Sequence, residues 1–389
     1  MSKPVARRIC VVTGGRADYG ALAPVMRAIQ ASPSLDLLTV AAGMHLSAVY
    51  GNTVDEIVAD CFTVDGRVEV LPASDSGLDV AFAVSDGVAG FARTFAELAP
   101  DAVLVLGDRF EIFAAVTAAT LLKLPVIHLC GGDVSEGAVD DVLRHAMTKM
   151  AHLHFATNEH SAARIRQMGE APANVHVVGS PGIDAIVQFD FLDRGEIESR
   201  LGFKLRRKNL LITFHPVTMA DDLGTGELAA LLEALASLGS DIGQIFTMPN
   251  ADAGGRGIAA MIENFVAGAD NRIARKSLGQ ALYLSLLREA DAVVGNSSSG
   301  LSEAPSLNTP TLDIGARQKG RLSGSSVAHC PGDAQAIRTG IDTLFGKQVS
   351  DFTNPYGDGQ SAVRIISVLE RTVDFRALLN KIFHRQDAA

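Results

Sequence analysis

The segment from residue 128 to residue 150, HLCGGDVSEGAVDDVLRHAMTKM, concentrates ionisable side chains around one short turn. Its acids, and the two bases that follow them, are Asp133, Glu136, Asp140, Asp141, Arg144 and His145. At the end of a buried strand, desolvation and neighbouring carboxylates raise the pKa of an acid into the range used for acid–base catalysis. The alternative is an ordinary helix start, in which Asp140 and Asp141 stabilise the helix by interacting with its dipole and form ion pairs with the bases four positions later.

A second segment, GNSSSGLSEAP (295–305), places serines where a predicted strand turns into a helix. Hydroxyl and free N–H groups at a helix start bind phosphate with the help of the helix dipole, so Ser297 and Ser298 are candidate phosphate ligands. An ordinary N-cap is the alternative. Glu303 is either a ligand for ribose hydroxyls or a first-turn acid that stabilises the helix.

Other predicted strands also end in charged or polar side chains. These are Arg16 and Asp18 in TGGRADYG, Asp108 and Arg109 in GDR, His215 in FHPVT, Asn250 in TMPN and Arg317 in GARQKGR. Each alone has a structural explanation, such as a helix cap, a solvated loop charge or an exposed histidine. Their recurrence at one strand end after another predicts a binding site. Because TGGRADYG lacks the GxGxxG spacing and no GxxxxGK[ST] loop exists, neither a dinucleotide site nor a P-loop is predicted.

Strands must position these side chains, and the sequence predicts such strands throughout. Short runs rich in Val, Ile and Leu, each ended by Gly, Asn, Asp or His, alternate with amphipathic helical stretches. The pattern is typical of parallel strands buried on both faces and joined by crossover helices. The polar stretch 189–209 separates two such series, so we expect two doubly wound α/β domains with a boundary near residue 185. We expect ligands in the cleft between them, beyond the carboxyl ends of the strands.

Composition excludes several classes of protein. The chain has 389 residues, 47% of them hydrophobic, and a formal net charge of −10, which argues against a nucleic-acid surface. The four cysteines are scattered singly, which predicts neither a disulfide framework nor a zinc site. No signal peptide or membrane-spanning run is evident, so we expect a cytoplasmic protein that contacts no membrane.

Together these segments resemble the hydrolysing UDP-N-acetylglucosamine 2-epimerases of sialic and legionaminic acid biosynthesis. The matching stretches run from GGRADYGALAPV near residue 13 to NPYGDG near residue 359, and include GDRFEI, DDVLRHAMTKMAHLHF, FHPVT, PNADAGGR, SLGQALYLSLLREADAVVGNSSSG and IGARQKGR. The resemblance implies a GT-B fold, with Rossmann-like domains at 1–185 and 186–365 and a C-terminal helix, 366–389, that packs back on the first domain. It also implies a nucleotide-sugar substrate, no cofactor or metal, and a homodimer or homotetramer.

The same resemblance implies roles for individual residues. Family members remove and return a proton at sugar C2 while the nucleoside diphosphate leaves C1, through a 2-acetamidoglycal. Asp108 and Asp140 match the catalytic acids, and Arg144 matches their companion. The implied phosphate, ribose and further substrate contacts are His215, Ser297, Ser298 and Arg317, then Glu303, then Arg16, Asp18, Arg109 and Asn250.

The chain departs from the family pattern at Cys130, where a third catalytic acid, a glutamate, usually stands. One extra residue also lies between GGD and DD. Glu136 in this longer turn, Asp133, or a different substrate each offers an explanation. The candidate substrates are UDP-N-acetylglucosamine, GDP-N-acetylglucosamine and UDP-2,4-diacetamido-2,4,6-trideoxyhexose. Cys130 is expected to line the pocket, because this mechanism needs no nucleophile.

Two other classes of function share parts of this pattern. A GT-B glycosyltransferase would keep the phosphate site but would not need acids at positions 108, 136 and 140. A non-catalytic nucleotide-sugar binding protein would keep the serines and Arg317 and lose the acids. The presence of Asp108 and Asp140 favours the epimerase.

Overall fold

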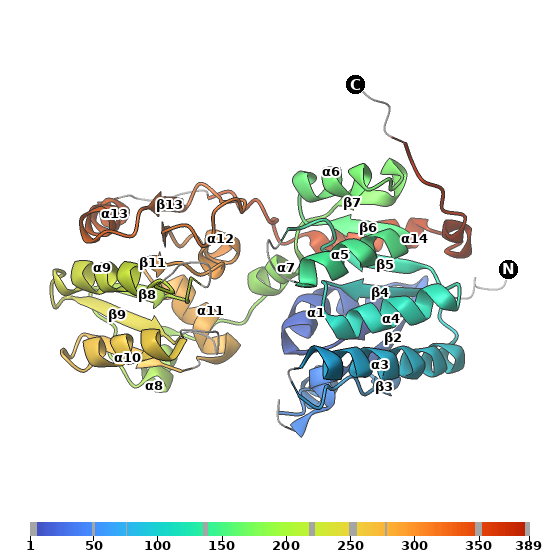
Figure 1. The fold of residues 1–389 in the computed structure, drawn as a ribbon, viewed down its shortest axis with the longest axis horizontal. Helices are drawn as coiled ribbons and strands as arrows, with labels where there is room; N and C mark the ends of the chain where they lie inside the picture. Colours follow the sequence, from blue (N-terminus) through green and yellow to red (C-terminus); the bar gives the residue numbers. More distant parts are fainter. Residues whose placement is uncertain are drawn as a thin grey trace. The chain divides into compact units, whose positions relative to one another are not determined.

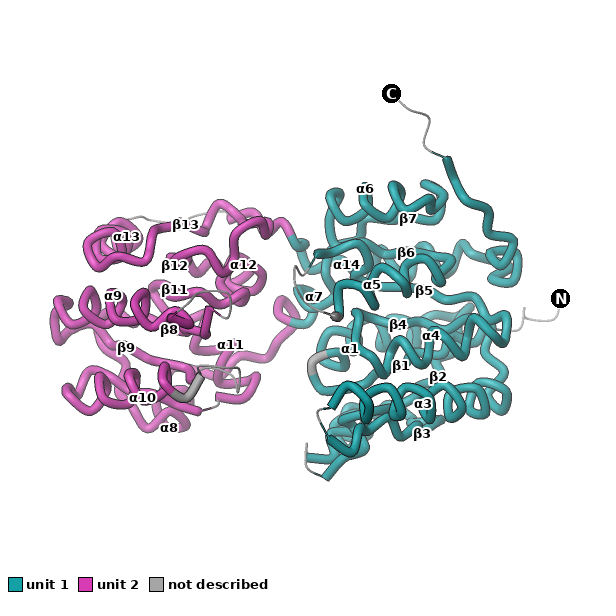
Figure 2. Tube along the Cα trace, in the orientation of Figure 1, with its two compact units in different colours: residues 1–185, 356–389 teal, residues 186–355 magenta. Residues whose placement is uncertain are grey.

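The computed structural model describes residues 6–48, 51–74, 76–134, 139–217, 222–248, 255–276, 278–346 and 352–385. The chain forms two compact units, coloured separately in Figure 2. Unit 1 comprises residues 1–185 and 356–389, and unit 2 comprises residues 186–355.

Unit 1 is built on a parallel sheet with strand order β3-β2-β1-β4-β5-β6-β7. The strands are β1 (Arg7–Thr13), β2 (Leu35–Ala42), β3 (Gly66–Val68), β4 (Ala102–Leu106), β5 (Val126–Leu129), β6 (Leu153–Ala156) and β7 (Val175–Val177). The helices are α1 (Arg16–Ala31), η1 (Gly43–Leu46), α2 (Val54–Ala59), α3 (Gly77–Leu98), α4 (Phe110–Leu121), α5 (Val139–Met150), α6 (Glu159–Gln167), η3 (Pro172–Asn174), α14 (Ser361–Arg371) and η5 (Arg376–Leu379). A further helix, α7 (Pro181–Val187), begins in unit 1 and ends in unit 2.

The central strands of unit 1 are apolar on both faces because helices cover both faces. Along β1, Ile9 and Val11 pack in a core with residues of α1 and α14. The alternate residues, Cys10 and Val12, pack in a second core with residues of α3, α4 and α5. Figure 1 shows α3, α4 and α5 in front of the sheet and α1 and α14 behind it.

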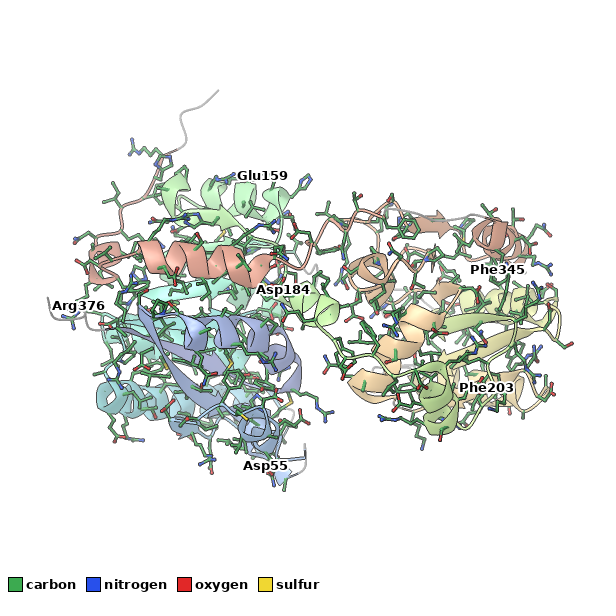
Figure 3. All side chains as sticks on the ribbon, turned by 180° about the vertical axis from the view of Figure 1, so that it is seen from behind. Asp55, Glu159, Asp184, Phe203, Phe345 and Arg376 are labelled. Carbon is green, nitrogen blue, oxygen red and sulfur yellow. The ribbon has the colours of Figure 1, made fainter. Side chains whose placement is uncertain are left out.

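The C-terminal part of the chain enters unit 1 at Tyr356, not at the residue 366 expected from the sequence. A boundary at 365 would cut through α14, which is one continuous helix packed against α1. The buried side chain of Asp184 accepts hydrogen bonds from the backbone N–H groups of Ser361 (2.9 Å) and Ala362 (2.7 Å), at the start of α14. Asp184 is labelled in Figure 3, where α7 meets α14.

Unit 2 is a second parallel sheet, with strand order β10-β9-β8-β11-β12-β13. Its elements are α8 (Arg194–Leu201), β8 (Lys208–Thr213), α9 (Thr225–Ala236), β9 (Ile242–Thr247), α10 (Gly255–Val266), β10 (Arg272–Arg275), α11 (Gly279–Glu289), β11 (Ala292–Gly295), α12 (Ser299–Ser302), η4 (Ala304–Leu307), β12 (Thr311–Ile314), β13 (Val327–Cys330) and α13 (Ala334–Gly346). Apolar residues of α9, α10 and α13 cover one face, and α11 packs against α8 and β8.

The strand orders identify where each sheet should bind ligands. In unit 1 the order reverses between β1 and β4, and in unit 2 it reverses between β8 and β11. Open parallel sheets bind ligands beyond the carboxyl ends of strands at this reversal. The expected site residues Asp18 and Asp108 follow the first strand pair, and His215 and Ser297 follow the second.

Candidate active site

In unit 1, the side chain of Arg144 connects the ends of two strands. Arg144 lies on α5 and is buried, at 6% exposure. Its guanidinium forms an ion pair with Asp108 after β4, donates to the backbone carbonyl of Asp133 after β5 (2.8 Å) and to Asp141 (3.2 Å). The expected Asp140–Arg144 pair is not among the ion pairs of the described residues, whereas Asp141 and His145 do pair, at 3.5 Å. Arg144 therefore holds Asp108 in place.

A second ion pair in unit 1 involves Glu111, an acid that the sequence alone does not mark as a site residue. Arg109 donates from Nε to Oε1 of Glu111 at 2.5 Å, and Glu111 is only 1% exposed. The other oxygen, Oε2, is buried and has no hydrogen-bond partner in the described residues. Glu111 lies in the first turn of α4, where acids are common because they stabilise the helix through its dipole. Its residue type and position alone therefore do not indicate a buried ion pair. Asp140 is exposed on α5, close enough for its charge to act on Arg109.

Asp18 shares this charged environment. Its Oδ2 accepts a hydrogen bond from the backbone N–H of Gly14 at 3.2 Å. Burial, reinforced by the negative charge of Glu111, raises the pKa of Asp18 to about 6, although Arg109 and the Gly14 hydrogen bond oppose the shift. Arg16, by contrast, is largely exposed and pairs with Glu56 at 2.6 Å. No hydrogen bond or ion pair of the described residues joins Arg16 to Asp108 or Arg144.

The turn after β5 carries Cys130 in an uncommon backbone conformation. Its φ is +62°, in the left-handed region that few residues other than glycine adopt. Burial, reinforced by Asp133 and Asp108, raises the pKa of the Cys130 thiol far above its ordinary value. Two residues earlier, Nε2 of His128 donates to the carbonyl of Gly107 at 2.8 Å, and burial lowers the pKa of His128 to about 4. The thiol is therefore protonated and the imidazole neutral.

The carboxylate of Asp133 is engaged by the next strand and helix. Its Oδ1 accepts hydrogen bonds from the hydroxyl groups of Thr157, at 3.0 Å, and Ser161. These bonds tie the GGD turn to the connection between β6 and α6, which favours a positioning role for Asp133. Glu136 lies outside the described residues.

In unit 2, Asn296 joins the ends of three strands. Gly295 precedes it with φ +141°, and a Cβ at that position would lie 1.9 Å from the carbonyl oxygen of Thr213, so only glycine fits. The buried Asn296 amide accepts from the His215 N–H (2.7 Å) and donates to the His215 carbonyl (2.9 Å). The Asn296 carbonyl accepts from Arg317 (3.1 Å) and from Gln318 (2.8 Å). Asn296 was not predicted as a site residue, because its partners are remote in sequence.

A pocket of about 390 Å³ opens beside this junction. Its lining residues are Thr213, His215, Thr247, Met248, Leu278, Gly279, Gln280, Tyr283, Ser297 and Ser299. Ser298 occupies the N-cap position of α12, but its side chain makes no capping hydrogen bond and is exposed. The capping explanation for Ser298 is thus not realised in the structure.

Three further predicted substrate contacts belong to unit 2: Glu303, Arg317 and Asn250. Glu303 accepts a hydrogen bond from the hydroxyl of Ser299, and burial raises the pKa of Glu303 against the opposing effect of that bond. Arg317 contacts the backbone beside the pocket. Asn250 lies outside the described residues. Within the described ranges, no group of three or more His, Cys, Asp or Glu side chains is arranged to hold a metal ion.

Comparison with known proteins decides the family. A model described as UDP-N-acetylglucosamine 2-epimerase matches residues 27–370. The chain belongs to the UDP-N-acetylglucosamine 2-epimerase family. Membership in this family makes it a nucleotide-sugar 2-epimerase, and the family predicted from the sequence is confirmed.

Two relatives of this epimerase have 37% sequence identity to it. A UDP-N,N′-diacetylbacillosamine 2-epimerase (hydrolyzing) of Legionella pneumophila aligns over 375 residues, 96% of this chain and 98% of the relative. A GDP/UDP-N,N′-diacetylbacillosamine 2-epimerase (hydrolyzing) of Campylobacter jejuni aligns over 317 residues, 81% of this chain and 82% of the relative.

A solved structure shares the fold of the epimerase. The UDP-GlcNAc 2-epimerase of Neisseria meningitidis, bound to UDP-GlcNAc, superposes with a TM-score of 0.76 at 19% identity, covering 94% of this chain and all of that one. The predicted GT-B type of fold, with two Rossmann-like units, is therefore confirmed. Among the described residues of the epimerase, no helix is long and apolar enough to cross a membrane.

Proposed function

We propose that this epimerase is of the hydrolysing type and converts a nucleoside diphosphate 2-acetamido sugar to the free 2-epimeric sugar and the nucleoside diphosphate. The first candidate substrate is UDP-N,N′-diacetylbacillosamine, a UDP-2,4-diacetamido-2,4,6-trideoxyhexose. Both 37%-identical relatives carry diacetylbacillosamine in their names. UDP-N-acetylglucosamine and GDP-N-acetylglucosamine are the other candidate substrates. The released sugar would serve sialic or legionaminic acid synthesis.

The observation that carries this proposal is the ion pair of Asp108 and Arg144 at the reversal point of the first sheet. In the proposed reaction, a carboxylate takes the C2 proton while the C1–oxygen bond breaks and a C1=C2 double bond forms. Water then adds its oxygen to C1, and C2 receives a proton on the opposite face. A weakly acidic C–H requires a carboxylate held in place, and Arg144 supplies that support to Asp108. Asp140 and Glu136 are the proposed partners in proton transfer.

The leaving diphosphate requires fixed donors, because negative charge develops on it as the C1–oxygen bond breaks. The pocket of unit 2 presents His215, Ser297 and Ser299. The Asn296 amide fixes the backbone at His215, and the carbonyl of Asn296 orients Arg317. We assign the diphosphate to these residues together with Ser298.

The acid missing at position 130 is assigned to Glu136. Oδ1 of Asp133 accepts hydrogen bonds from Thr157 and Ser161, which favours a positioning role, and the thiol of Cys130 stays protonated and carries no carboxylate. Glu136→Gln should lose about 100- to 10,000-fold in turnover while still binding the nucleoside diphosphate. Adding Cys130→Glu to Glu136→Gln should restore part of the lost turnover, whereas Cys130→Gln should not. Near-normal turnover of Glu136→Gln would return the role to Asp133.

The reaction type is tested by incubating the enzyme with the three nucleotide sugars in deuterated water. The expected products are the nucleoside diphosphate and a free 2-epimeric sugar that carries one deuterium at C2, measured by NMR and mass spectrometry. Release of the diphosphate with no deuterium at C2 would mean simple hydrolysis and exclude the glycal route. Asp108→Asn serves as the matched control for background hydrolysis.

A further inference from the structure

Glu111 is buried, although an acid at a helix start does not need to be. Acids in the first turn of a helix stabilise it through its dipole from the surface, where they stay hydrated. The side chain of Glu111 lies instead against the backbone of Gly14, after β1, and of Gly43, after β2. A Cβ at Gly14 would lie 2.5 Å from Cγ of Glu111, so this path is open only because residue 14 is glycine. The ends of two strands therefore make room for one carboxylate that belongs to a third element.

This carboxylate restrains Arg109 at one nitrogen only. Oε1 of Glu111 accepts from Nε of Arg109 at 2.5 Å, and the guanidinium carbon lies 5.7 Å from the centre of the Phe110 ring. The two terminal nitrogens of Arg109 make no hydrogen bond to any residue that the structure describes. A guanidinium held at Nε in this way keeps its terminal nitrogens available for two parallel hydrogen bonds to oxygen atoms of a ligand.

The geometry of the pair is poorly suited to stabilising the fold. Oε2 of Glu111 is buried without a hydrogen-bond partner among the described residues, which costs free energy because an exposed oxygen would bind water. The side chain of Arg109 is 39% exposed, whereas that of Glu111 is 1% exposed. A buried carboxylate that holds an accessible guanidinium by one hydrogen bond fixes the position of a cation more effectively than it stabilises a core.

We propose that Glu111 is a positioning residue of the reaction, which directs the terminal nitrogens of Arg109 to the substrate and does not itself contact the substrate. This inference rests on the proposed function, which places proton transfer beside Asp108, the residue before Arg109. The family resemblance implies Arg109 as a substrate contact and leaves Glu111 without a role. The charges of Asp18 and Asp140 also act on Arg109. Without Glu111, the guanidinium is free to turn towards these acids and away from the substrate.

The test uses the full-length enzyme with the nucleotide sugar that it converts and compares variants by kcat/KM. Glu111→Met fills the same space without an acceptor, so it should lower kcat/KM by about 10- to 100-fold, the loss expected for one hydrogen bond to a charged group. Glu111→Gln keeps an oxygen that accepts from Nε of Arg109 and should recover a large part of this loss. A carboxylate that transfers protons would fail as glutamine as fully as it fails as methionine.

A double-mutant cycle tests whether Glu111 acts through Arg109. In an Arg109→Met background the guanidinium is gone, so Glu111→Met should change kcat/KM by less than about twofold. If Glu111→Met does not fold, Glu111→Ala takes its place in the cycle. Glu170→Gln is the matched control, because Glu170 is 2% exposed in the same unit and accepts from Lys149 at 2.5 Å. It removes a buried ion pair of the same kind and should keep kcat/KM, measured per folded protein, nearly normal.

The outcomes distinguish this inference from the proposed function. If wild type releases no epimerised sugar from any candidate substrate, the proposed function fails. If wild type is active and Glu111→Met loses as much kcat/KM in the Arg109→Met background as on its own, the inference is overturned and the proposed function stands. Equal losses in Glu111→Gln and Glu111→Met, or a loss of the same size in Glu170→Gln, would overturn it as well.

Discussion

The carboxyl ends of the two sheets carry different kinds of side chain. In unit 1, charged groups meet one another, as in the pairs Asp108–Arg144 and Arg109–Glu111. In unit 2, the pocket is lined chiefly by neutral groups, and a buried amide, Asn296, fixes the backbone around it. Groups that exchange protons must ionise, whereas groups that hold a leaving anion need only fixed donors. The contrast supports the proposal that proton transfer takes place in unit 1 and that unit 2 binds the nucleotide.

The largest expected effect is on turnover, and it tests the proposal that proton transfer takes place in unit 1. Asp108→Asn keeps the shape of the side chain and removes its charge, so we expect turnover to fall by about 100- to 10,000-fold. The affinity for the nucleoside diphosphate, measured by calorimetry, should not change. Arg144 keeps Asp141 as a partner in this variant, which limits the structural damage.

The matched control for Asp108→Asn lies at the other end of the same strand. Asp101 precedes β4 and accepts a hydrogen bond from the backbone N–H of Arg8 at 2.8 Å. Asp101→Asn should leave turnover nearly normal. Equal losses of turnover in the two variants would show that damage to β4, not lost acid–base chemistry, explains the result.

The next effect concerns the stability of unit 1 as a function of pH. The pKa of Asp18 is raised from 3.8 to about 6, so the folded state binds its proton more tightly than the unfolded state. The stability that this proton contributes is complete below pH 4 and is lost as the pH rises through 6, by up to about 3 kcal/mol. Asp18→Asn should therefore be more stable than wild type at pH 7, with the difference shrinking towards pH 4. Urea unfolding that shows the same difference at both pH values would contradict the raised pKa.

How far the sequence predicts this molecule depends on the range of the interactions involved. The strands around Asp108 and Ser297 follow from short apolar runs, because burial on both faces leaves a local pattern. The polarity of the stretch 189–209 predicts only a separator between domains, yet this stretch contains α8. The capping box of α8, formed by Asp193 and Glu196, is a local sequence signal for that helix. Local patterns therefore carry most of the fold.

The site residues that were missed have partners remote in sequence. Asn296 reaches His215 across 81 positions, and Tyr283 reaches Ser299 across 16. Glu111 is near its partner Arg109 in sequence, but its burial depends on how Gly14 and Gly43 pack against it. The residue pattern of one segment does not predict these contacts, because they form only when the sheet brings distant segments together.

A smaller effect is on nucleotide affinity, and it tests the proposal that unit 2 binds the nucleotide. Arg317→Ala should weaken binding of the nucleoside diphosphate by about 1–3 kcal/mol, because a charge-assisted contact oriented by Asn296 is lost. Arg321→Ala, in the same loop and with the same loss of charge, is the control and should bind almost normally, since Arg321 is exposed. Equal weakening in both variants, measured by calorimetry, would show that the net charge of the loop acts instead of one placed guanidinium.

The smallest expected effect is at Cys130, where the charged site of unit 1 contains an uncharged residue. The pKa of its thiol is raised by burial and by Asp133 and Asp108, so almost no thiolate forms at neutral pH. Because thiolate is the reactive form, iodoacetamide should modify Cys130 far more slowly than the exposed Cys61, as mass spectrometry of the digested protein would show. Cys130→Ser should likewise lose much less turnover than the loss of about 100-fold expected when a positioned acid is removed. Rapid alkylation of Cys130 that abolishes turnover, together with an inactive Cys130→Ser, would make the thiol a participant in the reaction and remove the vacancy that Glu136 is proposed to fill.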